Sequence, residues 1–378
     1  MVAGARLTID LEALAANYRL IRDRVAPAAV GGVVKANGYG LGAAQVARTL
    51  IDEGCRHLFV ALQGEAEALI PELPAGIPVY ILNGLLPGGE ASCAALGAVP
   101  VLNSLDQIER WSAEAARCDT RLPAVLQVDT GMSRMGLPGD EIAQLLARPE
   151  LLRPIDLHFI ISHLACADEP GDAANAAQET HFRTIAASFP GVPLALDNSG
   201  GSFHARGHFD LVRAGIALYG GAPHGNAPNP MRPTVHLEAR IAQLRTIPPG
   251  TGVGYGLTFK TTRETRIATI PVGYADGWPR CLGNRGWAYI AGIRVPFAGR
   301  VSMDSITLDV TDVPAEHLLP GAWVELLGPH QGIDQVAADA GTISYEILTQ
   351  LSRRYERVYL PSATSARIRS TASMKTAP

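Results

Sequence analysis

Five side chains that can take part in chemistry stand at the ends of short apolar runs of the sequence. They are Lys35, Asp129, His163, Ser199 and Arg213. A buried lysine is costly in its charged form, because burial disfavours the ammonium ion. A Schiff base between Lys35 and an aldehyde removes this cost, and a lysine whose amine reaches solvent is the structural alternative.

Two stretches of small residues indicate where a phosphate would bind. Ser199 is followed by two glycines, and Gly215 follows Ala214. Enzymes built on (β/α)8 barrels frequently bind phosphate with backbone N–H groups in the loops after the last two strands. A reactive lysine opposite such loops suggests pyridoxal 5'-phosphate as the cofactor. Arg213 is then either part of this site or the ion-pair partner of a nearby acidic residue.

The elements that must position these residues alternate regularly along the first part of the chain. Short aliphatic or β-branched runs alternate with stretches of helical period. Eight runs predict strands, at 30–35, 57–62, 78–82, 98–102, 124–128, 155–161, 194–197 and 209–213. Helices are predicted at 10–25, 43–53, 105–117, 140–147 and 178–189. Eight strands in this pattern favour an α/β fold with a closed (β/α)8 barrel of the TIM type over an open doubly wound sheet.

The pattern changes after a stretch rich in glycine and proline at 220–233. Short segments broken by these residues follow, at 239–247, 265–270, 287–290 and 323–327. They predict a mainly β C-terminal domain. We therefore expect a barrel domain at 10–232, a β domain at 233–368 with residues 1–9 as a candidate addition, and a disordered tail at 369–378.

Composition excludes several classes of protein. The 32 basic and 36 acidic residues give a net charge of −4, and scattered basic residues argue against nucleic-acid binding. The five cysteines have no CxxC spacing, which points to a reducing cytoplasm rather than to disulfides. No run approaches the about 18 apolar residues of a membrane span, and no signal peptide is evident. The sequence has no GxSxG, Walker A or HExxH motif, and we expect no metal site.

Eight segments of the chain, in order and spacing, resemble the alanine racemase family. They are VVKANGYG at 33–40, DTGMSRMG at 129–136, SHLACAD at 162–168, VRAGIALYG at 212–220, GYG at 254–256, GYADG at 273–277, GRVSMD at 299–304 and SYE at 344–346. The resemblance covers nearly the whole chain. It implies a pyridoxal-phosphate enzyme built of a barrel and a β domain.

The resemblance assigns the cofactor site. Lys35 would hold the cofactor covalently, His163 would line its ring, and Arg213 would contact its pyridine nitrogen. The residues that would hold the phosphate are Tyr39, Ser199, Gly215, Ile216 and Tyr345. A guanidinium only donates hydrogen bonds, so the ring nitrogen would stay unprotonated. A weaker electron sink of this kind favours racemisation over side reactions.

The resemblance also implies a two-base mechanism. Inverting a stereocentre requires one group on each face of the α-carbon, and Lys35 and Tyr255 would fill these roles. Tyr255 would come from the second subunit of a head-to-tail homodimer.

Further residues would bind or admit the substrate. Arg134 and the backbone N–H of Met303 would contact its carboxylate, Tyr274 and Arg300 would line its path, and Asp304 would support that region.

The sequence departs from the family pattern at three positions. Gln127 stands where many members carry a lysine, Leu41 replaces a common histidine, and Ala214 replaces a common proline. None of these changes removes a reacting group.

The expected function is interconversion of L- and D-alanine, supplying D-alanine for peptidoglycan. The alternatives are a serine or broad-specificity racemase, a decarboxylase of the same fold, which Arg213 argues against, and a non-catalytic cofactor carrier.

Overall fold

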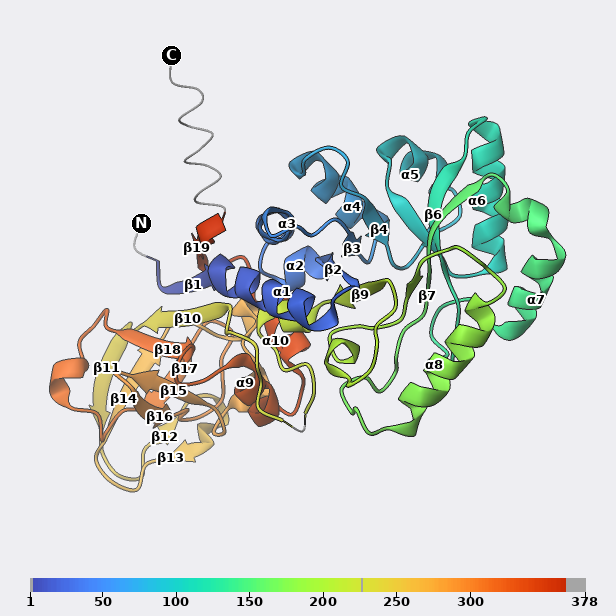
Figure 1. Cartoon of the computed structure of the whole chain (residues 1–378). Helices are drawn as coiled ribbons and strands as arrows, with labels where there is room; N and C mark the ends of the chain where they lie inside the picture. The colour runs from blue at the N-terminus through green and yellow to red at the C-terminus, as the bar shows by residue number, and fades with distance from the viewer. Residues whose placement is uncertain (1–2, 226, 365–378) are drawn as a thin grey trace, which may run out of the picture. The chain divides into compact units, whose positions relative to one another are not determined.

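The computed structural model describes residues 3–225 and 227–364. It divides into two compact units, which we describe separately (Figure 1). The barrel unit comprises Ala15–Leu218 and Ala222–Pro230, and the β unit comprises the described residues before 15, at 219–221 and from 231 onward. The predicted domain limits stay predictions, and the predicted tail at 369–378 lies outside the described residues.

The barrel unit contains eight parallel strands, and each overlaps one predicted run. They are β2 (Ala29–Val33), β3 (Leu58–Val60), β4 (Val79–Ile81), β5 (Val99–Leu102), β6 (Leu122–Gln127), β7 (Ile155–Ile161), β8 (Leu194–Ala195) and β9 (Leu211–Ala214). Their order is β8-β7-β6-β5-β4-β3-β2-β9. Between β8 and β9, Asp210 N donates to Leu194 O and Arg213 N to Asp197 O, both at 2.9 Å. The predicted barrel is therefore confirmed, as a nearly closed one.

Helices alternate with these strands, as the sequence predicted. They are α1 (Leu11–Val25), α2 (Lys35–Tyr39), α3 (Ala43–Asp52), α4 (Gln63–Leu69), α5 (Glu90–Leu96), α6 (Leu105–Arg117), α7 (Gly139–Ala147) and α8 (Ala173–Ala186). In α6 the buried residues Leu105, Ile108, Trp111 and Ala115 recur every three or four positions, which places them on one face.

Most predicted boundaries in the barrel unit differ from the observed ones by a few residues, and two of these differences have a clear physical reason. The helix predicted at 178–189 begins at Ala173, because Asp172 caps it by accepting a hydrogen bond from Ala174 N at 2.8 Å. The strand predicted to reach Lys35 ends at Val33, because the chain enters a left-handed turn directly after the lysine.

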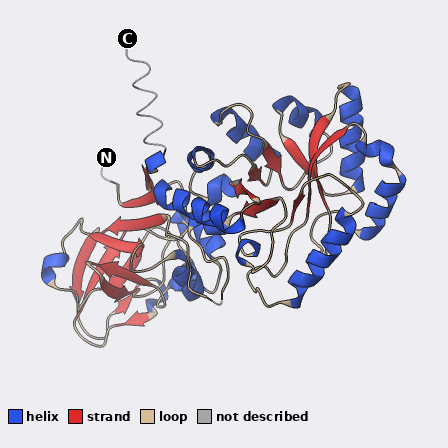
Figure 2. Cartoon of the chain, in the orientation of Figure 1, coloured by secondary structure: helices blue, strands red, loops and turns tan. Residues whose placement is uncertain are grey.

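The β unit contains three sheets, whose strands Figure 2 draws in red like those of the barrel unit. The six-stranded sheet has the order β16 (Ile293–Pro296), β15 (Trp287–Ile290), β18 (Trp323–Leu327), β10 (Val235–Arg240), β1 (Ala5–Asp10) and β19 (Glu356–Leu360). The three-stranded sheet joins β11 (Gln243–Ile247), β14 (Thr265–Ile270) and β17 (Ile306–Asp309), and the third pairs β12 (Gly252–Val253) with β13 (Phe259–Lys260). The mainly β character is confirmed.

Two features of the β unit escaped the sequence analysis. The segment 239–247, predicted as one strand, contributes to two different sheets, because the chain turns at Ile241 and Ala242 without a glycine or proline to signal it. Helices α9 (Ile333–Ala340) and α10 (Ser344–Gln350) were also missed.

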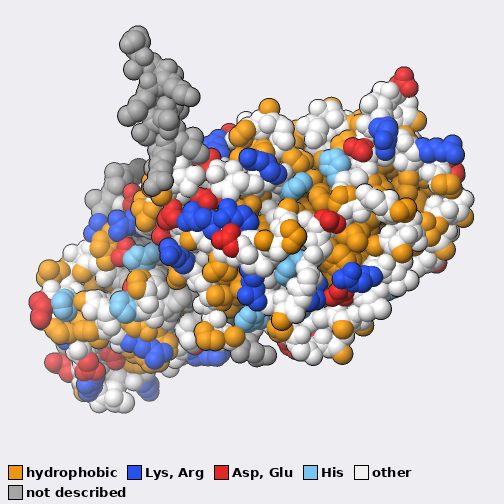
Figure 3. Space-filling model, in the orientation of Figure 1, with side chains coloured by type: hydrophobic (Ala, Val, Ile, Leu, Met, Phe, Trp, Pro, Cys, Tyr) orange, Lys and Arg blue, Asp and Glu red, His pale blue; other side chains and the backbone are white. Residues whose placement is uncertain are grey.

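Acidic and basic side chains are interspersed on the face shown in Figure 3. No helix in the described ranges has both the length and the apolar character needed to cross a bilayer.

Candidate active site

The predicted cofactor residues of the barrel unit gather at the carboxyl ends of its strands. Lys35 follows β2 by two residues, His163 follows β7 by two, and Arg213 lies in β9 itself. Ser199 follows β8 by four residues. Because the strands are parallel, these ends share one rim of the barrel, where barrel enzymes hold their active sites.

Arg213 is a buried guanidinium whose donors are directed at backbone carbonyls. Its Nη1 donates to Ala195 O at 2.8 Å. Its Nη2 donates to Leu196 O at 3.2 Å and also to Ser162 O. Burial lowers the pKa of Arg213 to about 10, and Asp197 acts in the opposite direction. The side chain therefore stays protonated at neutral pH and can only donate.

His163 lies beside this guanidinium, with 3.3 Å between Arg213 Nη2 and His163 Nδ1. Burial lowers the pKa of His163 to about 3, and Arg213, Arg134 and Lys35 add to the effect because each is positively charged. The imidazole is consequently neutral at physiological pH. Its other ring nitrogen, Nε2, lies 3.4 Å from Asn198 Nδ2.

Lys35 stands among the same charges. Burial lowers the pKa of its amine, and Arg134 lowers it further, whereas Glu65 raises it. A lowered pKa increases the fraction of neutral amine, which is the form that attacks a carbonyl or accepts a proton. Arg134 is thus electrostatically coupled to both Lys35 and His163, as a shared site requires.

The chain after Lys35 adopts an unusual backbone. Ala36, Asn37, Gly38 and Tyr39 have φ angles of 52°, 55°, 63° and 52°, all in the left-handed region. An L-residue with a side chain loses roughly 1–2 kcal/mol in a left-handed helical conformation, so surrounding contacts must hold this turn.

The predicted phosphate loops contact each other. Ser199 Oγ is buried and accepts hydrogen bonds from Gly215 N at 2.8 Å and Ala217 N at 3.3 Å. A Cβ at position 215 would overlap the hydroxyl of Tyr39, so this close approach requires glycine. The structure therefore brings Tyr39, Ser199, Gly215 and the adjoining Ile216 together.

The loop that carries Arg134 is folded by its first residue. Asp129 Oδ1 accepts hydrogen bonds from three successive backbone N–H groups, at residues 131–133, over 2.9–3.1 Å. Gln127, which replaces the family's common lysine, donates from Nε2 to Met135 O at 3.2 Å. Gln127 thus anchors the far end of the same loop without supplying a charge.

The other predicted site residues lie in the β unit, on exposed loops and, for Tyr345, at the start of a helix. Tyr255 is 72% exposed and stands between two glycines of positive φ. A Cβ at Gly256 would lie 3.3 Å from Arg300 Nη1, so the Tyr255 turn and Arg300 are neighbours. Tyr345 is the second residue of α10 and is 42% exposed.

Two further loops of the β unit are joined through their backbones. Tyr274 N donates to Ser302 O, and Ala275 N donates to Met303 O, both at 3.0 Å. The arrangement brings the exposed side chains of Tyr274 and Met303 onto adjoining segments. Asp304 follows directly.

The sequence analysis missed two residues that support site loops, one in each unit. Arg354 bridges Asp304 (2.8 Å) and the buried Asp276 (3.2 Å). In the barrel unit, buried Gln178 donates to His163 O at 2.9 Å and accepts from Ala165 N at 2.9 Å. Neither has a local sequence signal, because their partners are distant along the chain or are backbone atoms.

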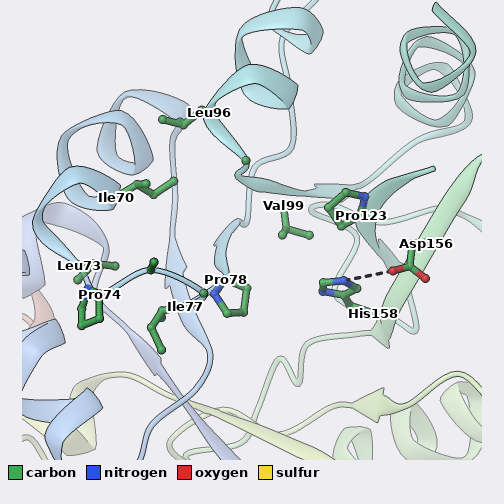
Figure 4. Close-up of a pocket in the computed structure, with 13 residues that line it drawn as sticks. Ile70, Leu73, Pro74, Ile77, Pro78, Leu96, Val99, Pro123, Asp156 and His158 are labelled. Atoms are coloured by element: carbon green, nitrogen blue, oxygen red, sulfur yellow. Dashed lines mark ion pairs between the residues drawn. The ribbon is translucent and has the colours of Figure 1, made fainter. Parts of the chain in front are cut away.

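A separate cavity of about 580 Å³ lies at the opposite, amino-terminal ends of β4–β7 (Figure 4). Most of its lining residues are apolar, and His158 and Asp156 stand at one side, where His158 Nε2 and Asp156 Oδ2 are 3.7 Å apart. Behind it, Tyr80 Oη lies 3.3 Å from His158 Nδ1 and 3.0 Å from His57 Nδ1. No predicted site residue lines this cavity, and residues at this end of a barrel typically serve stability.

Within residues 3–225 and 227–364, no group of three or more His, Cys, Asp or Glu side chains is arranged to hold a metal ion.

Comparison with known proteins supports one family over the whole chain. Residues 9–223 match the N-terminal domain of alanine racemase, and residues 234–359 match its C-terminal domain. A relative from Agrobacterium fabrum, named "Alanine racemase, catabolic", is 50% identical over 98% of this chain and 95% of its own length. "Alanine racemase" from Brucella ovis is 51% identical over 95% of this chain and 94% of its own length.

Solved structures agree. Alanine racemase from Bartonella henselae with covalently bound pyridoxal phosphate superposes with a TM-score of 0.92 at 43% identity, covering 95% of this chain and all of the other. The enzyme from Streptomyces coelicolor superposes with a TM-score of 0.88 at 34% identity, over 95% and 98% of the two chains. This chain belongs to the alanine racemase family.

Proposed function

We propose that this protein interconverts L-alanine and D-alanine with pyridoxal 5'-phosphate held covalently by Lys35. The observation that carries the proposal is the position of Lys35. It stands on the rim that bears Arg213 and His163, and burial and positive charge lower its pKa. The similar structure with covalently bound pyridoxal phosphate supports it.

The residues present fit this cofactor. The close approach of Gly215 to Tyr39 and the buried Ser199 form a cradle of small and hydroxyl groups suited to a phosphate. Together with Ile216 and Tyr345 they would hold it. Arg213 would face the ring nitrogen, and His163 would lie along the ring. When bound, the cofactor supplies a conjugated ring that withdraws electrons from the substrate's α-carbon.

Arg213 limits how strongly that withdrawal acts. Its guanidinium remains charged and has no lone pair to accept a proton, so beside the ring nitrogen it could only donate a hydrogen bond, and that nitrogen would stay unprotonated. A ring in that state would withdraw electrons more weakly, which would favour the return of a proton to the α-carbon and hence racemisation.

Lys35 and Tyr255 move the protons. The Lys35 amine exchanges a proton on one face of the α-carbon, and the phenol of the partner subunit's Tyr255 does so on the other. The exposure of Tyr255 on a glycine-flanked turn suits a residue that completes a site on a second chain. A head-to-tail homodimer is part of this proposal.

The remaining roles concern the substrate. Arg134 and Met303 N–H bind its carboxylate, and Tyr274 and Arg300 line its path. Asp304, held by Arg354, supports this region.

The physiological role has two candidates. Supply of D-alanine for peptidoglycan is the first. Breakdown of D-alanine is the second, because relatives from Agrobacterium fabrum and Rhizobium johnstonii, 50% and 52% identical, are both named catabolic. The five cysteines are all free, which supports a reducing cytoplasmic setting for either role.

The experiment is to scan the purified protein for bound-cofactor absorbance at about 420 nm and to follow D-isomers formed from L-alanine and L-serine. Rapid formation of D-alanine, lost in Lys35→Ala, supports the proposal. Faster conversion of serine indicates a racemase of other or broader specificity. Cofactor absorbance without any isomer formed indicates a carrier and overturns the proposed activity.

A further inference from the structure

Glu65, at the start of α4, connects the loop after β3 to the turn that carries Lys35. Its Oε1 accepts a hydrogen bond from Ala36 N at 2.6 Å. Its Oε2 accepts from Ala61 N at 2.7 Å and from Leu62 N at 3.2 Å. One carboxylate thereby binds three backbone N–H groups on two neighbouring barrel loops. Bonds of this charge-assisted kind are among the stronger ones in proteins.

The bond to Ala36 acts where the left-handed turn begins. Ala36 is the first residue after Lys35 and the first of the four left-handed residues. The far end of the turn is held separately, because Asn37 O accepts from Gly42 N at 2.8 Å and Asn37 Oδ1 accepts from Ala43 N at 3.1 Å. Glu65 is thus the side chain that fixes the lysine end.

We propose that Glu65 is the positioning residue for Lys35, fixing the lysine's backbone through Ala36 N–H and balancing the positive charge around its amine. The inference rests on the proposed function, in which Lys35 holds the cofactor. Three charged or titratable groups surround the Lys35 amine: Arg134, Glu65 and the neutral His163. Burial and Arg134 lower the pKa of the amine, whereas Glu65 raises it.

The role requires a carboxylate of this length. Glutamine has one acceptor oxygen, and its NH₂ group would face a backbone N–H donor. Aspartate keeps the charge and can still cap α4, but it is one methylene shorter and loses the reach to Ala36. Glu65→Gln therefore removes the negative charge, whereas Glu65→Asp keeps the charge and removes the hydrogen bond to Ala36 N.

The test compares Glu65→Gln and Glu65→Asp with Glu67→Gln in the cofactor-loaded protein. Glu67 is a matched control, because it lies on the same helix, is exposed, and accepts a hydrogen bond from the Gln63 side chain. Two quantities are measured: the cofactor retained after dialysis, and the pH midpoint of the absorbance change of the lysine-bound cofactor.

We expect both Glu65 variants to retain cofactor roughly ten-fold less well than Glu67→Gln, the effect of losing one charge-assisted bond. Glu65→Gln should also move the pH midpoint down by about half a unit or more, because a negative charge that raises the pKa of the Lys35 nitrogen is lost. Glu65→Asp should move it less. A purely structural role of Glu65 would leave this midpoint in place.

If Glu65→Gln and Glu65→Asp both match Glu67→Gln in cofactor retention and in pH midpoint, the inference about Glu65 is overturned. The proposed function is not affected by that result. If Glu65→Gln does not fold, the retention of Glu65→Asp decides. If the unmodified protein shows no absorbance that depends on Lys35, the proposed function fails, and this inference falls with it.

Discussion

Arg213 and His163 meet inside the barrel unit with 3.3 Å between Nη2 and Nδ1. The pair consists of a guanidinium that cannot lose its proton at neutral pH and an imidazole that cannot gain one. The barrel thereby presents a fixed positive donor beside a neutral ring. The proposed racemase chemistry depends on this combination, because neither group delivers a proton to the cofactor ring.

Arg213→Lys tests the fixed donor. Lysine keeps the charge but loses the planar fork that binds the carbonyls of Ala195, Ser162 and Leu196. We expect the free energy of unfolding to fall by about 2–3 kcal/mol and turnover to fall roughly ten-fold or more. Urea unfolding and D-alanine formation measure these effects. Arg148→Lys, which alters a surface ion pair with Glu109, should change neither; equal effects in the two variants would contradict the account.

His163 should make the protein sensitive to acid. Its pKa of about 3 in the folded protein lies below its ordinary 6.5, so the unfolded state binds more protons between these values. Its contribution to stability is complete above pH 6.5 and is lost as the pH falls toward 3, by up to about 1.4 kcal/mol per pH unit. Urea unfolding at pH 7, 6, 5 and 4 should therefore show a shallower loss for His163→Asn than for the unmodified protein. Parallel curves would refute this assignment.

Gly215→Ala should introduce a collision with the Tyr39 hydroxyl. Overpacking of this kind costs about 1–3 kcal/mol. Removal of the hydroxyl in a Gly215→Ala, Tyr39→Phe double variant should return a large part of that loss. Thermal unfolding of the two single variants and the double variant gives the coupling, and strictly additive effects would show that the two groups are not in contact.

Tyr255→Phe should abolish at least about 99% of turnover, within the usual range for loss of a general acid–base group. Because Tyr255 is exposed in the single chain, the stability of that chain should change by less than about 0.5 kcal/mol.

Mixing inactive Tyr255→Phe with inactive Lys35→Ala after dissociation should restore activity. A mixed dimer has one site with both Lys35 and Tyr255 intact if the site is shared between subunits. No recovery in confirmed mixed dimers would mean that each chain forms its own site.

The barrel was predictable from the sequence because its signals are local. Each strand is a short aliphatic run, and helices such as α6 carry an apolar stripe of helical period. The break at Ile241 and Ala242 was not predictable, because no turn-forming residue marks it. The left-handed turn after Lys35 was hidden for a different reason: Asn37 and Gly38 favour positive φ, but Ala36 and Tyr39, which share that conformation, do not.

The supporting residues of the site were less accessible than the reactive ones. Lys35 and Arg213 stand at the ends of apolar runs, and that position alone draws attention to them. Glu65 and Arg354 act through contacts that span 29 and 50 positions of the chain, so only the folded structure relates them to their partners.

The most direct test of the central claim is the formation of D-alanine from L-alanine by the purified protein, measured together with cofactor absorbance in the unmodified chain and in Lys35→Ala. The account predicts racemisation and absorbance in the first, and neither in the second. D-alanine formation that persists in Lys35→Ala, or an unmodified protein that holds the cofactor without forming D-alanine, would contradict it.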